Sequence, residues 1–308
     1  MSPARAVVFA YHDVGVRCLK TLISAGVEIP LVVTVPDDPH ETHWYASVAA
    51  TAADYRLPVI APPDPNTPQL ERDLGALKPD FVFSFYYRAM LDGPLLRAAR
   101  RGALNMHGSL LPKYRGRAPV NWAILRGERE SGATLHYMTE RADAGDIVDQ
   151  LAVPILRDDD AREVLAKVTV AAETVLARSL PALVAGSAPR RLQPILPGEY
   201  FGRRTAADGR IDWRRPALEI HNLVRAVAPP FPGAFGDVAG ERWAIHRTRL
   251  TAQAVPGGGP QLFAARGECY LACGVGAALQ LLAAASAAGP VDLTALAGTV
   301  SRRPLPLA

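Results

Sequence analysis

The sequence predicts a Rossmann-like, doubly wound α/β domain with a mostly parallel sheet, followed by a small C-terminal β-barrel domain of OB-like type. Three observations indicate this organisation. Short apolar runs alternate with amphipathic segments through the first half of the chain, as in parallel sheets covered on both faces. After a connector rich in proline and glycine, the pattern changes to short strands separated by turns. The 308 residues, 49% of them hydrophobic, suffice for packed cores in both parts.

The first half of the chain contains the predicted parallel strands and their helices. The strands are expected at Ala6–Tyr11, Ile29–Val35, Leu57–Ala61, Phe81–Tyr87 and Gly102–His107. Helices are expected between them, at Val14–Gly26, Trp44–Arg56 and Gln69–Lys78, and the segment Leu95–Arg101 precedes the fifth strand. Two further strands, Ser131–Met138 and Gly145–Ile155, enclose a loop with the sequence RADAG, and a long helix follows at Ala161–Gly186. This alternation predicts a Rossmann-like domain at residues 1–187.

The second half begins after a connector at residues 188–208, and we expect the small domain at residues 209–308. A helix is predicted at Pro216–Pro229, and strands are predicted within Arg242–Leu250, Pro260–Gly274 and Ala278–Ala284. The segment PGGGP reads as a loop, because no strand precedes it and no helix follows it as a phosphate-binding loop requires.

Charge and cysteine content narrow the class of protein. The formal net charge of +4 suits a small anionic ligand but lacks the clustered patch typical of nucleic-acid binding, so no nucleic acid is expected. Three cysteines indicate a reducing compartment rather than a disulfide framework. The first residues form neither a signal peptide nor a membrane span. We therefore expect a cytoplasmic protein without membrane insertion.

One group of polar residues lies where chemistry is expected. Asn105 and His107 end a predicted strand on the same side, and Asp143 follows in the RADAG loop. If this loop folds over the strand end, the carboxylate of Asp143 raises the pKa of His107, and the amide and ring form a donor pair for an oxyanion. Ser109 has no nucleophile-elbow context, so a direct attack by a second substrate is favoured. Spacing alone is equally consistent with strand-end caps and turns.

Other polar residues have a functional and a structural interpretation. His12 follows the first strand and either lines a pocket or occupies a turn. Arg203 and Arg204 either clamp phosphates or belong to a solvated connector, and the basic loop Lys113, Arg115 and Arg117 can meet anionic substrate groups.

No metal site is expected. His40 and His43 lie in a proline-flanked loop without further ligands, and Cys269 and Cys273 lie in a strand-like segment where burial is favoured over zinc binding. The four tryptophans, Trp44, Trp122, Trp213 and Trp243, are expected in cores or interfaces.

The stretches NMHGSLLPKYRGRAPVNWAI and SGATLHYMTERADAGDIV resemble the 10-formyltetrahydrofolate-dependent formyltransferases. The resemblance implies a Rossmann-like folate domain, a barrel-like second domain and 10-formyltetrahydrofolate as formyl donor. It also implies that Asn105 stabilises the transition state, that His107 is the acid/base and oxyanion partner, and that Asp143 raises the pKa of His107.

Ligand contacts are likewise implied by the resemblance, residue by residue. The folate contacts fall on Ala89, Met90, Leu91, Arg117, Thr139, Glu140, Arg141 and Ala142, in addition to Asp143. Apart from the resemblance, their place in the chain makes five residues candidate substrate contacts: His12, Lys113, Tyr114, Arg203 and Arg204. Position 89 is often a larger polar residue in relatives, so a side-chain contact there implies a different pterin pocket.

The segments VVFAYHDVG, FSFYYR and FGRRT are most similar to formyltransferases that act on UDP-4-amino-4-deoxy-L-arabinose. This likeness implies a cytoplasmic role in lipid A modification and polymyxin resistance. Such relatives carry a second Rossmann domain that oxidatively decarboxylates UDP-glucuronic acid, and we expect that activity to belong to a separate protein or to be absent. Alternative hypotheses are formylation of another nucleotide-linked amino sugar, methionyl-tRNA formyl transfer, a non-catalytic sensor and a formate-releasing hydrolase. The sequence makes no prediction of oligomeric state.

Overall fold

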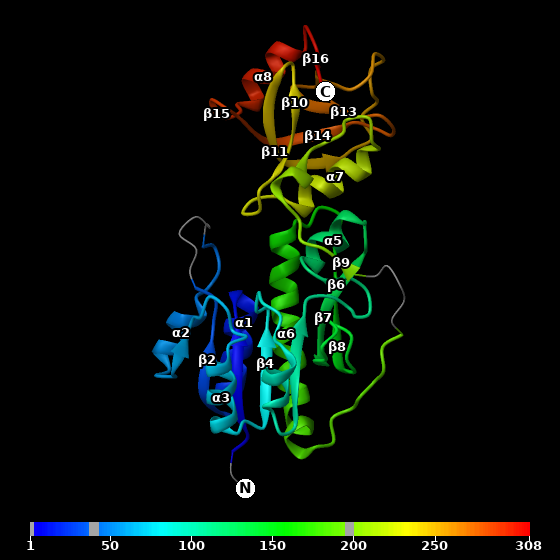
Figure 1. Cartoon of the computed structure of the whole chain (residues 1–308). Coiled ribbons are helices and arrows are strands. Elements are labelled where there is room, and N and C mark those ends of the chain that lie inside the picture. Colours follow the sequence, from blue (N-terminus) through cyan, green and yellow to red (C-terminus); the bar gives the residue numbers. More distant parts are fainter. Residues whose placement is uncertain (1–2, 37–42, 195–199) are drawn as a thin grey trace. The chain divides into compact units, whose positions relative to one another are not determined.

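A computed structural model of the chain describes residues 3–36, 43–194 and 200–308. It divides into two compact units, shown in Figure 1. The first comprises residues 1–119, 130–154 and 165–202, and the second comprises residues 120–129, 155–164 and 203–308, within these described ranges. Two internal segments of the first half therefore belong to the second unit.

The first unit is built on a seven-stranded sheet in the order β3-β2-β1-β4-β5-β7-β8. Its strands are β1 (Arg5–Ala10), β2 (Glu28–Val33), β3 (Val59–Ile60), β4 (Phe81–Phe85), β5 (Gly102–His107), β7 (Glu130–Tyr137) and β8 (Ile147–Pro154). The first five strands are parallel, whereas β7 runs antiparallel to β5 and β8 antiparallel to β7. The predicted doubly wound, mostly parallel sheet is confirmed.

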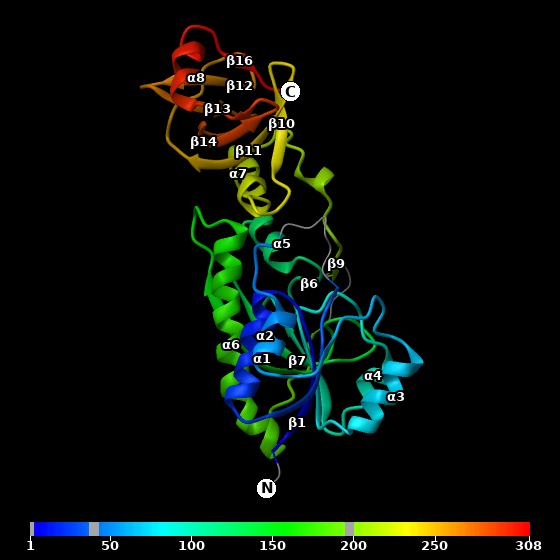
Figure 2. The same cartoon turned by 90° about the vertical axis from the view of Figure 1, so that its left-hand side faces the viewer.

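Helices cover both faces of this sheet. They are α1 (His12–Ser24), α2 (Val48–Asp54), α3 (Pro68–Leu77), α4 (Gly93–Arg97) and α6 (Ala161–Ala185). In Figure 2, α1 and α6 lie on one side of the strands and α3 and α4 on the other. On the α3 and α4 side, Leu70, Leu74 and Leu95 pack against the alternate strand residues Val7 and Phe9 in one apolar core. This burial explains why the predicted strands are apolar on both faces.

The starts of α1 and α2 differ from the sequence-based prediction for identifiable reasons. The helix predicted from Val14 begins at His12, because β1 turns directly into α1 through a positive φ of 65° at that residue. The helix predicted from Trp44 begins at Val48, because the Ser47 side chain accepts a hydrogen bond from the N–H of Ala50 at 3.2 Å. A serine cap of this kind satisfies an N–H that lacks a partner inside the helix and sets the first turn there.

The helix α6 is long and apolar enough to cross a membrane, by length and composition alone. Half of its most apolar window is buried inside the protein, and residues such as Val168, Ala172, Val175 and Leu176 are almost fully inaccessible. This burial is that of a core helix in a packed α/β domain.

The second unit contains a closed ring of antiparallel strands. Its elements are α5 (Pro119–Leu125), the short 3₁₀ helix η1 (Ala206–Gly209), α7 (Ala217–Ala226), β10 (Ala234–Val238), β11 (Glu241–Leu250), β12 (Gln261–Ala265), β13 (Glu268–Ala272), β14 (Leu279–Ser286), β15 (Gly289–Pro290), α8 (Leu293–Val300) and β16 (Leu305–Pro306). The strand order is β10-β11-β14-β13-β12-β16, with β15 paired to β14. A bridge between Val238 and Leu307 joins the two ends of this order, and Asp237 and Ala308 exchange backbone hydrogen bonds at 3.2 Å. The predicted barrel-like domain is confirmed.

Hydrogen bonds from α7 explain why two internal segments belong to the second unit. The buried guanidinium of Arg225 donates to the carbonyl oxygens of Asp159 (3.0 Å) and Leu156 (3.4 Å), while Asn222 accepts from the same group. The side chain of Asn121 donates to the carbonyl oxygen of Ala226 at 2.7 Å. A charged donor that satisfies several buried carbonyls holds the segment firmly, because removing it would leave those carbonyls unpaired.

We expect His221 to make the second unit acid-sensitive. Its ring is buried between the Thr248 hydroxyl (2.9 Å) and the carbonyl oxygen of Arg157 (3.1 Å). Burial and the nearby charge of Arg225 lower the pKa of His221 from its ordinary value of 6.5, against the opposing effects of the Arg157 carbonyl and Asp158. Below pH 6.5 the unfolded chain therefore binds a proton that the folded chain does not, so stability falls as the pH falls.

The measurement is the melting temperature from pH 8 to pH 5 for the parent and for His221→Gln. The variant should lose about 1 kcal/mol of stability at pH 8, from its altered hydrogen bonds, and should show a flatter pH dependence. An equally steep decline in both proteins would contradict the assignment to His221.

Candidate active site

Adjacent strands place the polar residues of the candidate site on one face of the sheet. In the antiparallel pair β5–β7, Asn105 lies opposite His136 and His107 lies opposite Thr134. Residues directly opposite each other share a face, and alternate residues of one strand do so too. The register therefore gathers these four side chains at the carboxyl end of β5, as the sequence predicted for Asn105 and His107.

Asp143 lies at the centre of the group. Its Oδ1 atom accepts a hydrogen bond from the Asn105 amide at 3.3 Å and lies 3.5 Å from both His107 Nδ1 and His136 Nε2. Its Oδ2 atom accepts a hydrogen bond from the backbone N–H of Gly116 at 2.9 Å. The predicted approach of Asp143 to Asn105 and His107 is thus present, although the His107 contact is at ion-pair rather than hydrogen-bond distance. Their catalytic roles stay a prediction.

The environment of Asp143 favours its ionised form. Burial alone would raise the pKa of this carboxyl group. The charge of His107, the hydrogen bond and charge of His136, and the N–H of Gly116 outweigh burial and hold the pKa well below its usual range. Asp143 is therefore negatively charged at neutral pH.

The two histidines have different hydrogen-bonding requirements. His136 Nδ1 lies 2.8 Å from the carbonyl oxygen of Tyr137, so it carries a hydrogen, and its Nε2 lies 3.1 Å from the Asn105 amide nitrogen and 3.5 Å from Asp143 Oδ1. His107 faces oxygen atoms on both sides, since Nε2 lies 2.9 Å from the carbonyl oxygen of Tyr114 and Nδ1 faces Asp143. Only a doubly protonated ring donates to both oxygens.

A two-stranded parallel sheet supports Asp143 from the other side. It pairs β6 (Arg115–Gly116) with β9 (Tyr200–Phe201), and the N–H of Arg117 donates to the carbonyl oxygen of Phe201 at 2.9 Å. Gly116 has a φ of 104°, and a Cβ atom there would collide with that same carbonyl oxygen. Only glycine, which has no Cβ atom, lets the two backbones come this close. Gly116 therefore both donates to Asp143 and allows β9 to pair with β6.

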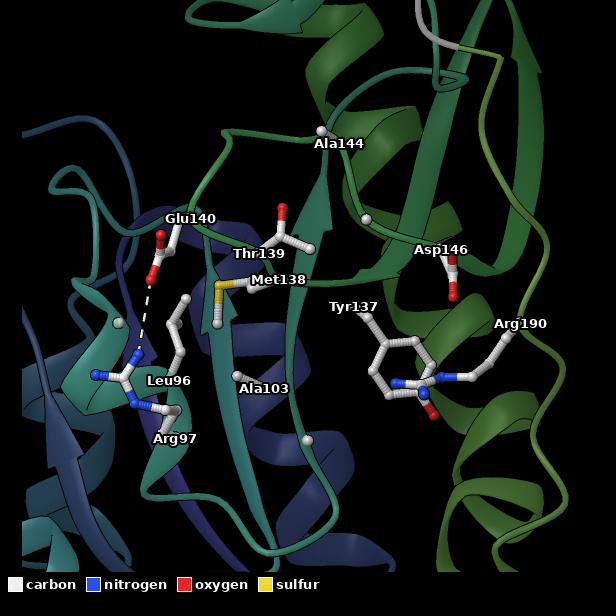
Figure 3. A pocket seen from close by; sticks show the side chains of 13 residues that line it. Leu96, Arg97, Ala103, Tyr137, Met138, Thr139, Glu140, Ala144, Asp146 and Arg190 are labelled. Carbon is white, nitrogen blue, oxygen red and sulfur yellow. Dashed lines mark ion pairs between the residues drawn. The ribbon is translucent and has the colours of Figure 1, made fainter.

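A cavity of about 410 Å³ lies beside the Asp143 loop. Figure 3 shows Leu96, Ala103 and Met138 on its inner wall, with Thr139 and Glu140 on the loop above them. The remaining lining residues are Gly93, Arg97, Gly102, Tyr137, Ala144, Gly145, Asp146 and Arg190. Its size is in the range of small-molecule sites, and its mixture of apolar wall and loop backbone suits a flat heterocycle.

Of the predicted folate contacts, Thr139 and Glu140 line this cavity. Glu140 forms an exposed ion pair with Arg97 at 3.6 Å. The other predicted contacts are outside the lining set and lie after β4, in the Asp143 loop and next to β6: Ala89, Met90, Leu91, Arg141, Ala142 and Arg117. Ala89 is exposed and does not line the cavity. The alanine at this position therefore does not change the cavity wall.

The predicted substrate contacts are divided between the two units. His12 is buried at the start of α1, Lys113 is exposed, and the Tyr114 ring packs 4.9 Å from that of Phe201. Arg203 and Arg204 belong to the second unit, where Arg204 lies 4.8 Å from the ring centroid of Trp122. Their role in phosphate binding stays a prediction.

Other expected features can be located as well. Cys269 and Cys273 are buried free thiols, and burial raises the pKa of each, to about 11 and about 12. His40 lies outside the described residues. Within residues 3–36, 43–194 and 200–308, no three His, Cys, Asp or Glu side chains are grouped to hold a metal ion.

Two contributors to the site were missed by the sequence analysis. His136 had a detectable signal, because it alternates with Thr134 in a strand pattern and so shares its polar face. Gly116 had none, since its part depends on a two-residue pairing with a segment far along the chain.

With this geometry established, comparison with known proteins gives the family. Residues 6–180 match the formyl transferase family, and residues 203–291 match the formyl transferase C-terminal domain. The chain belongs to the formyl transferase family. The prediction of a formyltransferase is therefore confirmed, and the family domains coincide with the α/β and barrel parts of the structure.

Solved structures of N-formyltransferases share the fold. One is the N-formyltransferase from Helicobacter canadensis in complex with folinic acid and dTDP-3-aminofucose, with 21% identity, a TM-score of 0.72 and coverage of 91% of this chain and 99% of that chain. Another is WlaRD, a sugar 3N-formyltransferase solved with dTDP and 5-N-formyl-THF, with 18% identity, a TM-score of 0.72 and coverage of 95% and 99%. A 4-N formyltransferase from Francisella tularensis has 20% identity, a TM-score of 0.62 and coverage of 75% and 91%.

Proposed function

We propose that the protein transfers a formyl group from 10-formyltetrahydrofolate to the amino group of a nucleotide-linked amino sugar. The observation that carries the proposal is the contact of the Asp143 carboxylate with Asn105, His107 and His136 beside a cavity of about 410 Å³. The sugar N-formyltransferases of similar fold, two of them solved with formylated folates, support the choice of donor and acceptor class.

The cavity fits the pteridine part of the donor. Leu96, Ala103 and Met138 offer an apolar wall to the fused rings, and the backbone of Thr139, Glu140 and Ala144–Asp146 offers polar groups for the ring nitrogens and oxygen. Because Asp143 directly precedes Ala144 of the cavity lining, a pteridine bound there brings the formyl-bearing nitrogen toward Asn105 and His107.

In the proposed reaction a neutral amine attacks the formyl carbon, a new C–N bond forms and the formyl oxygen becomes negative. Asn105 and a doubly protonated His107 stabilise this oxyanion by donating hydrogen bonds. The bond to the donor nitrogen then breaks, and the proton lost by the amine passes to that nitrogen through His107 or through water held by Asp143. For His107 Nε2 to donate to the oxyanion, it must exchange its present partner, the carbonyl oxygen of Tyr114.

As the acceptor we propose UDP-4-amino-4-deoxy-L-arabinose, and for the protein a cytoplasmic role in lipid A modification and polymyxin resistance. The support is the similarity of VVFAYHDVG, FSFYYR and FGRRT to formyltransferases with that substrate.

The test is a panel of UDP- and dTDP-linked amino sugars incubated with 10-formyltetrahydrofolate, with the mass gain of one formyl group as the readout. Formylation of the arabinose compound supports the whole proposal, and formylation of another sugar alone corrects the acceptor. Formate release at equal rates with and without acceptor, or formylation of methionyl-tRNA only, would overturn the function. A reaction without protein gives the background.

A further inference from the structure

A short stretch of the connector, Arg190–Gln193, lies across the base of the loop that joins β7 to β8. The backbone of Arg191 exchanges two hydrogen bonds with that of Ile147, at 2.8 and 2.9 Å, where β8 begins. The guanidinium carbon of Arg190 lies 3.8 Å from the centroid of the Tyr137 ring, and Figure 3 shows one group over the other. This part of the predicted connector is therefore held against the first unit.

Gln193 reaches the loop itself through its side-chain amide. Its Nε2 atom donates hydrogen bonds to the carbonyl oxygens of Asp143 (3.2 Å) and Gly145 (2.5 Å). Only the NH₂ end of an amide can donate to two carbonyl oxygens, so these partners determine which end faces the loop. The Oε1 atom is buried and has no hydrogen-bond partner among the described residues. The polar contacts that place this side chain are therefore its two donor bonds to the loop.

The backbone of the loop is strained where these bonds are made. Asp143 has a φ of 50°, a conformation that is uncommon outside glycine and that persists only where surrounding contacts hold it. Gly145 lies so close to the carbonyl oxygen of Tyr137 that a Cβ atom would collide with it. The amide of Gln193 binds the carbonyl oxygens of both loop residues and so stabilises this conformation.

The same connector supports the carboxylate side of Asp143. Further along the chain, Tyr200–Phe201 form β9, which pairs with β6, and the N–H of Gly116 in β6 donates to Asp143 Oδ2 at 2.9 Å. Asp143 is thus held through its carbonyl oxygen by Gln193 and through its carboxylate by Gly116. With both contacts in place, Oδ1 faces the candidate catalytic side chains of β5 and β7.

We propose that Gln193 is a positioning residue for formyl transfer, which holds the backbone of Asp143 so that its carboxylate stays in contact with Asn105 and His107. This inference rests on the proposed function, because it gives Asp143 a part in the reaction. Gln193 is not among the residues that line the donor cavity, so it acts through the loop rather than on the donor. A displacement of about 1 Å in a reacting group can lower a rate about 100-fold.

The first experiment measures kcat for formyl transfer in Gln193→Met and Gln193→Glu. Methionine fills a similar volume but donates no hydrogen bond, whereas glutamate keeps the shape and sets a carboxylate oxygen against two carbonyl oxygens. We expect kcat to fall about 10- to 100-fold in Gln193→Met and further in Gln193→Glu. Far-UV circular dichroism verifies that each variant is folded.

The matched control is Gln280→Met, which changes a half-buried glutamine of β14 in the second unit. Parental kcat in folded Gln193→Met and Gln193→Glu, or an equal loss in Gln280→Met, would overturn the proposal.

The second experiment determines whether Gln193 acts through the Asp143 carboxylate. Because Asp143→Asn already removes that carboxylate, adding Gln193→Met to it should lower kcat by less than about threefold. A further loss as large as that caused by Gln193→Met alone would show that the amide acts independently of the carboxylate, and would contradict the proposal.

The third measurement, the melting temperature in acid, needs no activity. Release of the loop should let the pKa of Asp143 return toward its ordinary value of 3.8, because its carboxylate then leaves the two histidines and the N–H of Gly116. In the parent, the stability that comes from the lowered pKa is lost as the pH falls below 3.8. The melting temperature of Gln193→Met should therefore fall less steeply than that of the parent in this range.

The outcomes for Gln193 and for the proposed function are distinguishable. A flattened acid profile in Gln193→Met, in a protein that formylates no amino sugar, would support the positioning of Asp143 and reject the function. Formylation of an amino sugar with parental kcat and a parental acid profile in Gln193→Met would support the function and reject the role of Gln193.

Discussion

Replacing His107 by alanine is expected to lower kcat for formyl transfer about 100- to 10,000-fold, through loss of an oxyanion donor and of a proton-transfer group. The ring is 6% exposed, and its two nitrogens face Asp143 and the carbonyl oxygen of Tyr114. Among the residues that the structure describes around this ring, no side chain is placed to take over both roles. The Asn105 amide donates hydrogen bonds but cannot transfer a proton, and His136 is directed toward Asp143 and the carbonyl oxygen of Tyr137.

Single-turnover rates with 10-formyltetrahydrofolate and the acceptor found in the panel test this expectation. Because the substitution leaves a small cavity, the melting temperature is measured in parallel, and donor binding verifies that the site is intact. His246→Ala, a half-buried histidine of β11 in the second unit, is the control. A His107→Ala rate within a few-fold of the parent, in a folded variant, would show that the catalytic assignment is wrong.

The elements of the first unit could be predicted from local pattern because each strand is long enough to show it. Phe81–Phe85 is a strand of four apolar residues and one serine, and its burial on both faces is what a central parallel strand requires. Asn105 and His107 could be assigned to one face because a strand alternates sides residue by residue. The Asp143 loop could be connected to them only by supposing that it folds back, which the register of β7 and β8 makes possible.

The remaining features depend on contacts that leave no periodicity. The pairing of Arg115–Gly116 with Tyr200–Phe201 involves two residues on each side, too few to form a pattern. Unless this pairing is known, nothing in the sequence indicates that the N–H of Gly116 faces Asp143. The membership of residues 155–164 in the second unit depends on Arg225, whose guanidinium reaches carbonyl oxygens 66 and 69 residues earlier in the chain. Such long-range hydrogen bonds are satisfied by tertiary structure, which single-sequence patterns do not contain.

Asp143→Asn is expected to lower kcat about 100- to 1,000-fold, because an amide cannot replace a carboxylate that accepts on both sides. In the parent, Oδ2 accepts from the N–H of Gly116 while Oδ1 faces Asn105, His107 and His136. An asparagine must place its NH₂ group on one of these sides. It then opposes either the Gly116 N–H or the Asn105 amide, donor against donor.

The pH dependence of stability gives an independent readout of the same charge. Because the pKa of Asp143 is held below its ordinary value of 3.8, its stabilising contribution is present above that pH and is lost as the pH falls further. The melting temperature of Asp143→Asn should therefore fall less steeply than that of the parent below pH 4. The control is Asp73→Asn, which removes an exposed carboxylate of α3. If Asp143→Asn retained parental kcat, or if both proteins lost stability equally in acid, the carboxylate would not be the organising charge of the site. If Asp143→Asn loses activity and its melting temperature also depends less on pH below pH 4, both effects have one cause. The ionised Asp143 carboxylate then both orders Asn105 and His107 and contributes to the stability of the first unit.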